Sequence, residues 1–337
     1  MTVGSDLAID FGSATTRVAD SRGTLLFEQP TIAAVDGDSG RVLGIGDKAL
    51  AVGVATAGRV HLVRPVRHGQ LVDIALAEEV LGAVVRSSGV SRLSHPRVLA
   101  CVHVGATHVQ RRALDRALRR AGAREVRFVE QPIACAVGMG LAIEEPAGVM
   151  VVDVGAGTTD VAVLALGGMV TSRALPLGGE DADDAVRLAI ARRFGLVVDP
   201  ATATEVRRRI GSVAAPADRP RLEVRGRDAA TGEPTAVVLS TAEIAPVVDE
   251  IVRPILAAAV DCIATAPPDL ANDLLRSGLN LCGEGSLLDG LDARLAAATG
   301  LVVRAASEPG RRAVVGAARC LVHLESVRSP VTSPSRR

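Results

Sequence analysis

The pattern of apolar and polar positions repeats itself once along this chain. Residues 7–19 and 150–162 align without gaps, and each reads as an apolar run, Asp, any residue, Gly, two residues, Thr-Thr, any residue, Val and Ala. A repeat that occurs only twice, at a long interval, excludes a solenoid. The pattern therefore predicts two related domains.

Each copy of the repeat predicts a β-hairpin with a chemical role at its tip. A buried strand leads into Asp10 or Asp153, a Gly permits a tight turn, and the Thr residues begin the second strand. Such a tip presents backbone N–H groups and hydroxyls in a concave arrangement that suits phosphate, and the Asp can hold hydrated Mg²⁺. The alternative is two ordinary hairpins with tight glycine turns. Two hairpins in register favour a polyphosphate held from both sides.

Two helices can be located between and after these hairpins. Thr107 and Gln110 form a capping box before a helix that buries Val109 and Leu114 and ends near Gly122. A second helix is predicted from near Ser286 to Gly300, after a strand at 279–282 and a turn at 283–285. A glycine-rich turn between a strand and a helix N-terminus is a place for the polar groups of a nucleotide.

Composition narrows the class of protein. The 337 residues are 48% hydrophobic, which is enough for two α/β domains, and the formal net charge of zero gives nucleic-acid binding no support. The five cysteines are scattered without a C-x-x-C motif, which favours buried reduced thiols in a cytoplasmic protein over a disulfide or zinc site. The polar start at 1–6 does not resemble a signal peptide, and no apolar run reaches the roughly 18 residues of a membrane span.

The order of these motifs resembles the superfamily of actin, sugar kinases and heat-shock chaperones, and within it the MreB family of bacterial actins. The resemblance covers roughly residues 7–325. It is carried by the segments 97–101, 104–107, 121–126, 131–134, 177–180, 210–212 and 283–300. It implies an α/β, actin-like ATPase fold with two related ribonuclease-H-like domains around a nucleotide cleft.

The resemblance also implies domain limits. Domain I would comprise 1–147 and 310–327, with a subdomain IB at about 30–62. Domain II would comprise 148–309, with a subdomain IIB at about 179–238. The Ser/Pro/Arg-rich tail at 328–337 is expected to be disordered.

The resemblance implies ATP and Mg²⁺ as cofactors and assigns their residues. Asp10 and Asp153 would hold Mg²⁺, through water, and Gln131, Asp153 and Thr158 would serve hydrolysis. The nucleotide-binding residues would be Asp10, Gly12, Ser13, Ala14, Thr15, Gly155, Ala156, Gly157, Thr158, Thr159, Gly178, Gly179, Glu180, Arg207, Arg209, Gly283, Glu284, Gly285 and Ser286.

Members of the family polymerise at the inner membrane and organise cell-wall synthesis and cell shape. The implied partners are other copies of this chain in a filament, an MreB paralogue, membrane-bound cell-wall synthesis proteins and an anionic membrane surface, but no nucleic acid. The implied location is cytoplasmic, at the inner face of the membrane. Val90 and Leu93 in the loop at 87–96 would dip into the bilayer, or this is an ordinary exposed loop.

Three positions depart from the family pattern. Gln131 stands where the family has a Glu that orients the attacking water; Gln can position water but cannot act as a base. Arg209 replaces a Glu, and Glu284 replaces a Gly whose backbone conformation a side chain would strain. Arg209 and Glu284 either pair across the adenosine site or each point to solvent.

These departures leave two functions open. The first is a filament protein that binds ATP and hydrolyses it slowly after assembly. The second is a nucleotide-binding scaffold or co-polymer subunit with little or no ATPase activity. A small-molecule kinase is disfavoured, because the sequence offers no candidate base for a substrate and no insertion that would form a sugar pocket.

Overall fold

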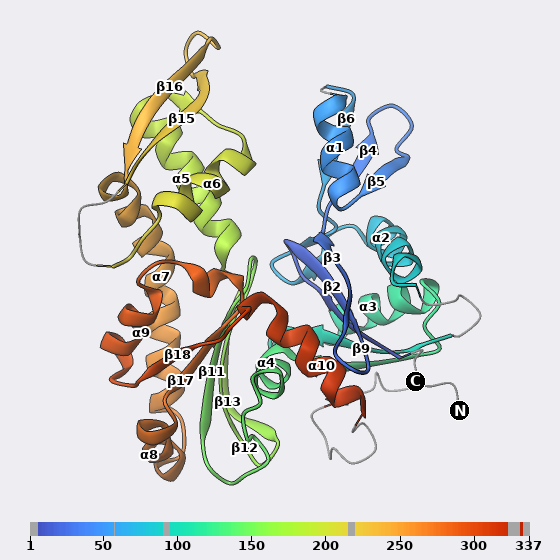
Figure 1. The fold of residues 1–337 in the computed structure, drawn as a ribbon, viewed down its shortest axis with the longest axis vertical. Coiled ribbons are helices and arrows are strands. Elements are labelled where there is room, and N and C mark those ends of the chain that lie inside the picture. Colours follow the sequence, from blue (N-terminus) through green and yellow to red (C-terminus); the bar gives the residue numbers. More distant parts are fainter. Residues whose placement is uncertain (1–5, 57, 90–94, 215–219, 323–330, 333–337) are drawn as a thin grey trace.

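The computed structural model describes residues 6–56, 58–89, 95–214, 220–322 and 331–332. Figure 1 shows two halves side by side, each built on a sheet with a smaller lobe above it. Val90 and Leu93, for which a membrane contact was one expectation, lie outside the described residues, as does most of the tail.

The first half contains a six-stranded sheet in the order β19-β10-β9-β1-β2-β3. β1, β2 and β3 form an antiparallel meander, whereas β1, β9 and β10 run parallel. The strands are β1 Leu7–Phe11, β2 Thr15–Asp20, β3 Leu25–Pro30, β9 Arg97–Val102, β10 Glu125–Glu130 and β19 Val331–Thr332. β19 pairs with β10 and belongs to the tail, so these two residues differ from the expected disorder.

The second half repeats this arrangement in a five-stranded sheet ordered β13-β12-β11-β17-β18. An antiparallel meander is again followed by parallel strands, as the sequence repeat leads us to expect. The strands are β11 Val149–Val154, β12 Thr159–Ala165, β13 Gly168–Leu175, β17 Leu279–Cys282 and β18 Val303–Ala305.

The smaller lobes and the remaining elements complete the two halves (Figure 1). In the first half these are β4 Ala33–Asp36, β5 Val42–Ile45, α1 Asp47–Ala55, β6 Val60–Val63, β7 Val66–Arg67, β8 Gln70–Leu71, α2 Ile74–Ser87 and α3 His108–Arg120. In the second half they are α5 Gly179–Phe194, β14 Leu196–Val197, α6 Pro200–Ile210, β15 Arg221–Asp228, β16 Pro234–Ser240, α7 Thr241–Ala264, α8 Pro268–Ser277, η2 Glu284–Leu287 and α9 Leu291–Thr299. The domain limits proposed from the resemblance remain a prediction.

Two helices fill the space between the sheets. α4 (Gln131–Met139) packs against α10 (Arg312–Val322), which follows the short helix η3 (Pro309–Arg311). Their core cluster includes Ala8 of the first sheet and Val151 of the second. Because strand side chains alternate between faces, the next inward positions on this shared side are Asp10 and Asp153. The alternation thus brings both predicted Mg²⁺ carboxylates to the facing sides of the two sheets.

Two local predictions about helices need correction. α3 has the predicted capping box of Thr107 and Gln110, but Val109 is 77% exposed, and the helix packs through Leu114, Ala117 and Leu118 instead. The predicted helix from Ser286 to Gly300 is split into η2 and α9, because Gly290 adopts a φ of 81° between them. Among the described residues, no helix has both the length and the apolar character needed to cross a membrane.

Candidate functional site

The tips of both predicted hairpins line one cavity between the two halves, with a volume of about 100 Å³. The tips approach closely: a Cβ added to Gly157 would lie 2.7 Å from the Ser13 hydroxyl. The predicted site residues that line this cavity are Asp10, Gly12, Ser13, Ala14, Thr15, Gln131, Asp153, Gly155, Ala156, Gly157, Thr158, Gly283 and Glu284.

In the first hairpin a buried Arg faces the predicted Mg²⁺ carboxylate. Asp10 and Arg17 are cross-strand partners in the β1–β2 ladder, and the turn is closed by a hydrogen bond from Gly12 N–H to the Thr15 carbonyl (3.2 Å). Burial raises the pKa of the Asp10 carboxyl, while the charge of Arg17 opposes this shift. The Gln131 amide, at the start of α4, donates a 3.5 Å hydrogen bond to Asp10 Oδ1.

In the second hairpin the corresponding pair consists of two carboxyls. Asp153 faces Asp160 across the β11–β12 ladder, and Gly155 N–H donates to the Thr158 carbonyl at 2.8 Å. Burial, reinforced by the nearby Asp10, raises the pKa of Asp153 to about 6. Burial and Asp153 raise the pKa of Asp160 well above its usual value. Asp160 accepts one hydrogen bond from Val104 N–H, and its Oδ2 has no hydrogen-bond partner within the described part of the chain.

The chemistry of these donors fits a magnesium ion. Asp10 and Asp153 are both buried and both line the cavity, so two carboxylates are desolvated at the floor of one site. Burying anions is costly unless cations compensate for them. Hard oxygen ligands and an adjacent solvent-accessible space suit an ion that keeps part of its water shell.

Further contacts hold the two hairpin tips and join the two halves of the molecule. The Arg64 guanidinium donates to the carbonyls of Ser13 (3.1 Å) and Ala14 (3.3 Å), and it forms an ion pair with Glu180 at 3.9 Å. His68 Nδ1 lies 3.1 Å from the carbonyl oxygen of Gly157. The turn between β7 and β8 in the first half therefore contacts the tip of the second hairpin directly.

Four of the other predicted residues lie on a second, smaller cavity in the second half. Gly178, Gly179, Arg207 and Gly285 line it. The turn at Gly178 is fastened to the second hairpin, because Gly179 N–H donates to the Gly155 carbonyl at 3.1 Å and Glu180 N–H donates to the Ala156 carbonyl at 2.7 Å. Arg207 is held by an ion pair with Asp183 of α5.

The predicted strain at Glu284 does not occur. The positive φ in this loop belongs to Gly283 (80°), where an added Cβ would lie 2.5 Å from Asp153 Oδ1, and Glu284 begins the short helix η2 with an ordinary negative φ. The Ser286 hydroxyl donates to the Gly283 carbonyl at 2.6 Å. The loop thus needs glycine at 283, and it accepts a side chain at 284.

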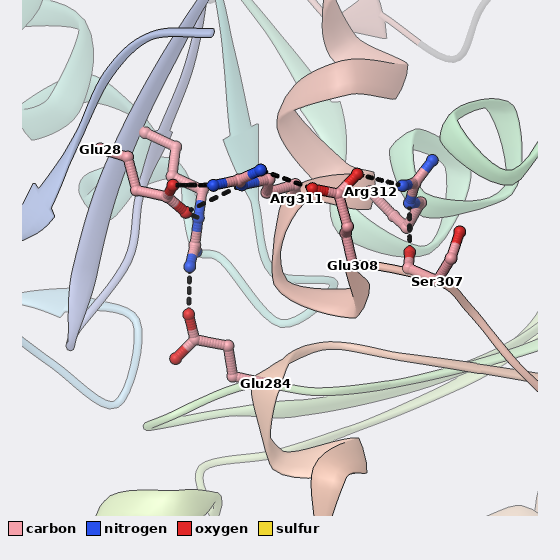
Figure 2. Close-up of polar contacts among 7 residues, drawn as sticks. Glu28, Glu284, Ser307, Glu308, Arg311 and Arg312 are labelled. Atoms are coloured by element: carbon pink, nitrogen blue, oxygen red, sulfur yellow. Dashed lines mark hydrogen bonds and ion pairs between the residues drawn. The ribbon is translucent and has the colours of Figure 1, made fainter.

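The predicted pairing of Arg209 with Glu284 is wrong. Arg209 is exposed on α6 and pairs with Glu205 one turn earlier at 3.1 Å. Glu284 instead forms an ion pair with Arg17 of β2. In Figure 2 this contact is the dashed line that ends on Glu284. Arg209, Glu180, Thr159 and Ser286 line neither of the two cavities. Thr159 is buried and donates to the Leu177 carbonyl at 2.9 Å.

The Arg17–Glu284 pair belongs to a larger network that sequence reasoning missed. Arg17 Nε donates to Glu28 of β3 at 2.7 Å, Arg311 of η3 donates to the same carboxylate at 2.6 Å, and Glu308 pairs with Arg311 (Figure 2). The network joins β2 and β3 of the first sheet to the loops after β17 and β18. One signal was present in the sequence: Arg17 and Asp160 occupy the same position of the repeat with opposite charges.

His103 and Arg111 are further cavity-lining residues that were not predicted. Burial, with a contribution from Arg111, lowers the pKa of His103. Arg111 forms an ion pair with Glu130 at 2.9 Å. No motif marks these residues, because His103 follows β9 and Arg111 lies on α3, and only packing brings these segments to the cavity.

Comparisons with known proteins agree with one another. The model of the MreB/Mbl protein family matches residues 4–329. The cell shape-determining protein MreB of Escherichia coli strain K12 is 37% identical over 313 residues, which cover 90% of each chain. The cell shape-determining protein Mbl of Bacillus cereus is 32% identical over 321 residues, covering 95% of this chain and 96% of the relative. The crystal structure of MreB5 of Spiroplasma citri bound to ADP is similar with a TM-score of 0.87, at 26% identity, over 95% of this chain and 96% of that one. The same protein bound to AMPPNP also gives a TM-score of 0.87.

Proposed function

Because this chain belongs to the MreB/Mbl family of actin-like, cell shape-determining proteins, we propose that it binds ATP with Mg²⁺ in the cavity between its halves and assembles into filaments. One observation supports the nucleotide above all others: the tips of two hairpins with the same sequence pattern, one from each half, line a single cavity and approach each other closely. The nucleotide complexes of MreB5 of Spiroplasma citri point to the same class of ligand.

The proposed roles follow from the position of each residue in the cavity. Backbone N–H groups at Ala14 and Gly157, within the two turns, and the nearby hydroxyls would hold phosphate oxygens, as turns of this kind do. Asp10 and Asp153 would hold Mg²⁺ through its waters, and the ion would neutralise charge that develops on the phosphates. The smaller cavity beside Gly178, Arg207 and Gly285 would take the adenosine.

Hydrolysis would depend on Gln131. Its amide is anchored on Asp10, so it can position a water molecule by hydrogen bonds but cannot remove a proton from it. We therefore expect slow turnover that responds to assembly rather than efficient catalysis. Phosphate release measured below and above the assembly concentration tests this, and turnover at background level in sedimented polymer would contradict it.

A second candidate is a nucleotide-binding scaffold or co-polymer subunit with little or no ATPase activity. The Arg17–Glu284 ion pair favours it, because a carboxylate on the cavity wall opposes a polyphosphate and engages a cation that could otherwise meet one. Nucleotide-dependent sedimentation without phosphate release would support this function over the first.

Isothermal titration with ATP and Mg²⁺ tests the nucleotide site itself. We expect Asp153→Asn to weaken binding by more than about tenfold, since it removes a carboxylate from the proposed Mg²⁺ ligands. Asp269→Asn, in the exposed first turn of α8, is the matched control and should bind like the wild type. Equal affinities for all three proteins, with unchanged circular dichroism, would rule out the proposed site.

Location and partners form the final part of the proposal. We place the filament at the inner face of the cytoplasmic membrane, with an MreB paralogue and membrane-bound cell-wall synthesis proteins as partners. Co-sedimentation of polymer with anionic vesicles, but not with neutral vesicles, is the expected result. If both kinds of vesicle stay in the supernatant while the polymer sediments, the proposed membrane contact is wrong.

A further inference from the structure

Cysteines that are far apart in the sequence gather beneath the cavity. Cys101, Cys135, Cys282 and Cys320 all belong to the core cluster around α4 and α10, whereas Cys262 lies in the core of the second half. All five are buried free thiols. Free cysteines are usually inert core residues, so a functional interpretation needs a specific arrangement of ligand atoms.

Such an arrangement is present at Asp153. Cys282 is the cross-strand partner of Asp153 in the parallel β11–β17 pair, and Cys135 approaches from α4, which packs on β11. The two Sγ atoms and a carboxylate oxygen of Asp153 all lie within 4.8 Å of one another, and all three residues are buried. Among the described residues, this is the group of His, Cys, Asp and Glu side chains with spacing suited to a metal ion.

The spacing fits tetrahedral coordination after a small adjustment. Bonds of about 2.3 Å to sulfur and about 2.0 Å to oxygen place the ligand atoms of a tetrahedral zinc site roughly 3.5–3.8 Å apart. Side-chain shifts of about 1 Å therefore suffice. Two thiolates and one carboxylate are a soft ligand set that prefers zinc-like ions to Mg²⁺.

Access from the cavity favours a cation at the same place. Asp153 and Cys101 line the cavity, so an ion can enter from it and keep an open fourth position on that side.

We propose that Cys135, Asp153 and Cys282 form a site for one thiophilic divalent cation of the zinc type. Binding converts the two thiols to thiolates and releases their protons to solvent. The ion joins α4 to β11 and β17. It also occupies the carboxylate that the proposed function assigns to Mg²⁺, so it competes with the magnesium nucleotide; this last part rests on the proposed function.

Cobalt titration tests the site without any nucleotide. We expect the reduced protein to take up one equivalent of Co²⁺, with the thiolate-to-cobalt charge-transfer band and the intense visible bands of tetrahedral coordination, and to lose both on addition of Zn²⁺. Cys135→Ala and Cys282→Ala should weaken Co²⁺ binding at least tenfold. Cys262→Ala and Cys320→Ala, which remove buried thiols outside the group, should retain both bands.

Two results would overturn the site: absence of the charge-transfer band in the wild type, or its persistence in Cys135→Ala and Cys282→Ala. If the alanine variants do not fold, a measurement on the wild type alone still tests the site. Zn²⁺ should slow alkylation of Cys135 and Cys282 several-fold, but not that of Cys262, as read by peptide mass spectrometry. Equal rates with and without Zn²⁺ would refute the proposal.

A competition experiment separates this proposal from the proposed function. One equivalent of Zn²⁺ should weaken binding of magnesium ATP by at least tenfold in the wild type and leave Cys282→Ala unaffected. Cobalt binding with no ATP binding at all would uphold the metal site and reject the nucleotide site. If the protein binds cobalt but its affinity for magnesium ATP does not change when Zn²⁺ is added, the proposed competition is wrong.

Discussion

At the scale of single residues, the two hairpins differ most at one repeat position. Arg17 in the first hairpin faces Asp10, and Asp160 in the second faces Asp153, each across a strand pair. An opposite charge stabilises the ionised form of a buried carboxyl, and a like charge destabilises it. In the first hairpin, the charge of Arg17 therefore compensates that of Asp10. In the second hairpin, the charges of Asp153 and Asp160 can be compensated only by a cation from outside the hairpin or by a proton.

This difference predicts how stability depends on pH at Asp160. Its pKa in the folded protein is raised by burial and by Asp153, so the folded state keeps a proton that the unfolded chain loses above its ordinary value near 3.8. Stability contributed by the protonated form is lost as pH rises from that value towards the raised one. We expect Asp160→Asn to be more stable than the wild type at neutral pH and to show no gain at acidic pH. Urea unfolding across this range is the measurement, and a gain independent of pH would contradict the electrostatic cause.

At the scale of elements, the helix α3 and the loop after β17 show what local sequence specifies. The capping box was predictable because Thr107 and Gln110 satisfy each other's backbone groups without help from the rest of the protein. The division of the predicted 286–300 helix was not predictable from periodicity. There Gly290 turns the chain while Asp289 forms a bridge to Ser212, a contact distant in sequence.

The capping box supplies a second stability test. Thr107→Ala and Gln110→Ala should each destabilise the protein by about 0.5–1.5 kcal/mol, because each leaves a backbone N–H at the start of α3 without its partner. The double variant should cost less than the sum of the two single changes, since the two hydrogen bonds are reciprocal. Chemical denaturation of all four proteins measures this coupling, and strict additivity would indicate that the two bonds act independently.

At the scale of the whole molecule, the halves are joined by the α4–α10 layer below the cavity and by ion pairs along its side. The layer shares one apolar cluster with both sheets. The ion pairs run from β2 and β3 to the loops after β17 and β18 (Figure 2). Because the side chain of Arg17 is only 7% exposed, its charge is stabilised by Asp10, Glu28 and Glu284 rather than by water.

This arrangement predicts unequal effects of two similar substitutions. Glu284→Gln should destabilise the protein by roughly 1–3 kcal/mol, because it removes a charged partner from a buried guanidinium. Glu308→Gln, at the exposed end of the same network, should change stability by less than about 0.5–1 kcal/mol. Urea unfolding at matched ionic strength compares them, and equal costs would show that burial of Arg17 does not control the energy.

The sequence alone determined the α/β class, the duplicated hairpins and the capped helix, because these follow from short-range patterns in strand period, turn chemistry and caps. The actin-like fold was implied by the resemblance of several segments to a known family. The tertiary structure decided which charged groups meet. Arg209 pairs with Glu205 on its own helix, and Glu284 pairs with Arg17 in the other half. Cys135 and Cys282, which are far apart in the sequence, both lie beside Asp153. A long charged side chain pairs with whichever opposite charge lies within reach in the folded protein. Those distances depend on how the two sheets pack on the shared helices α4 and α10. No local pattern encodes them.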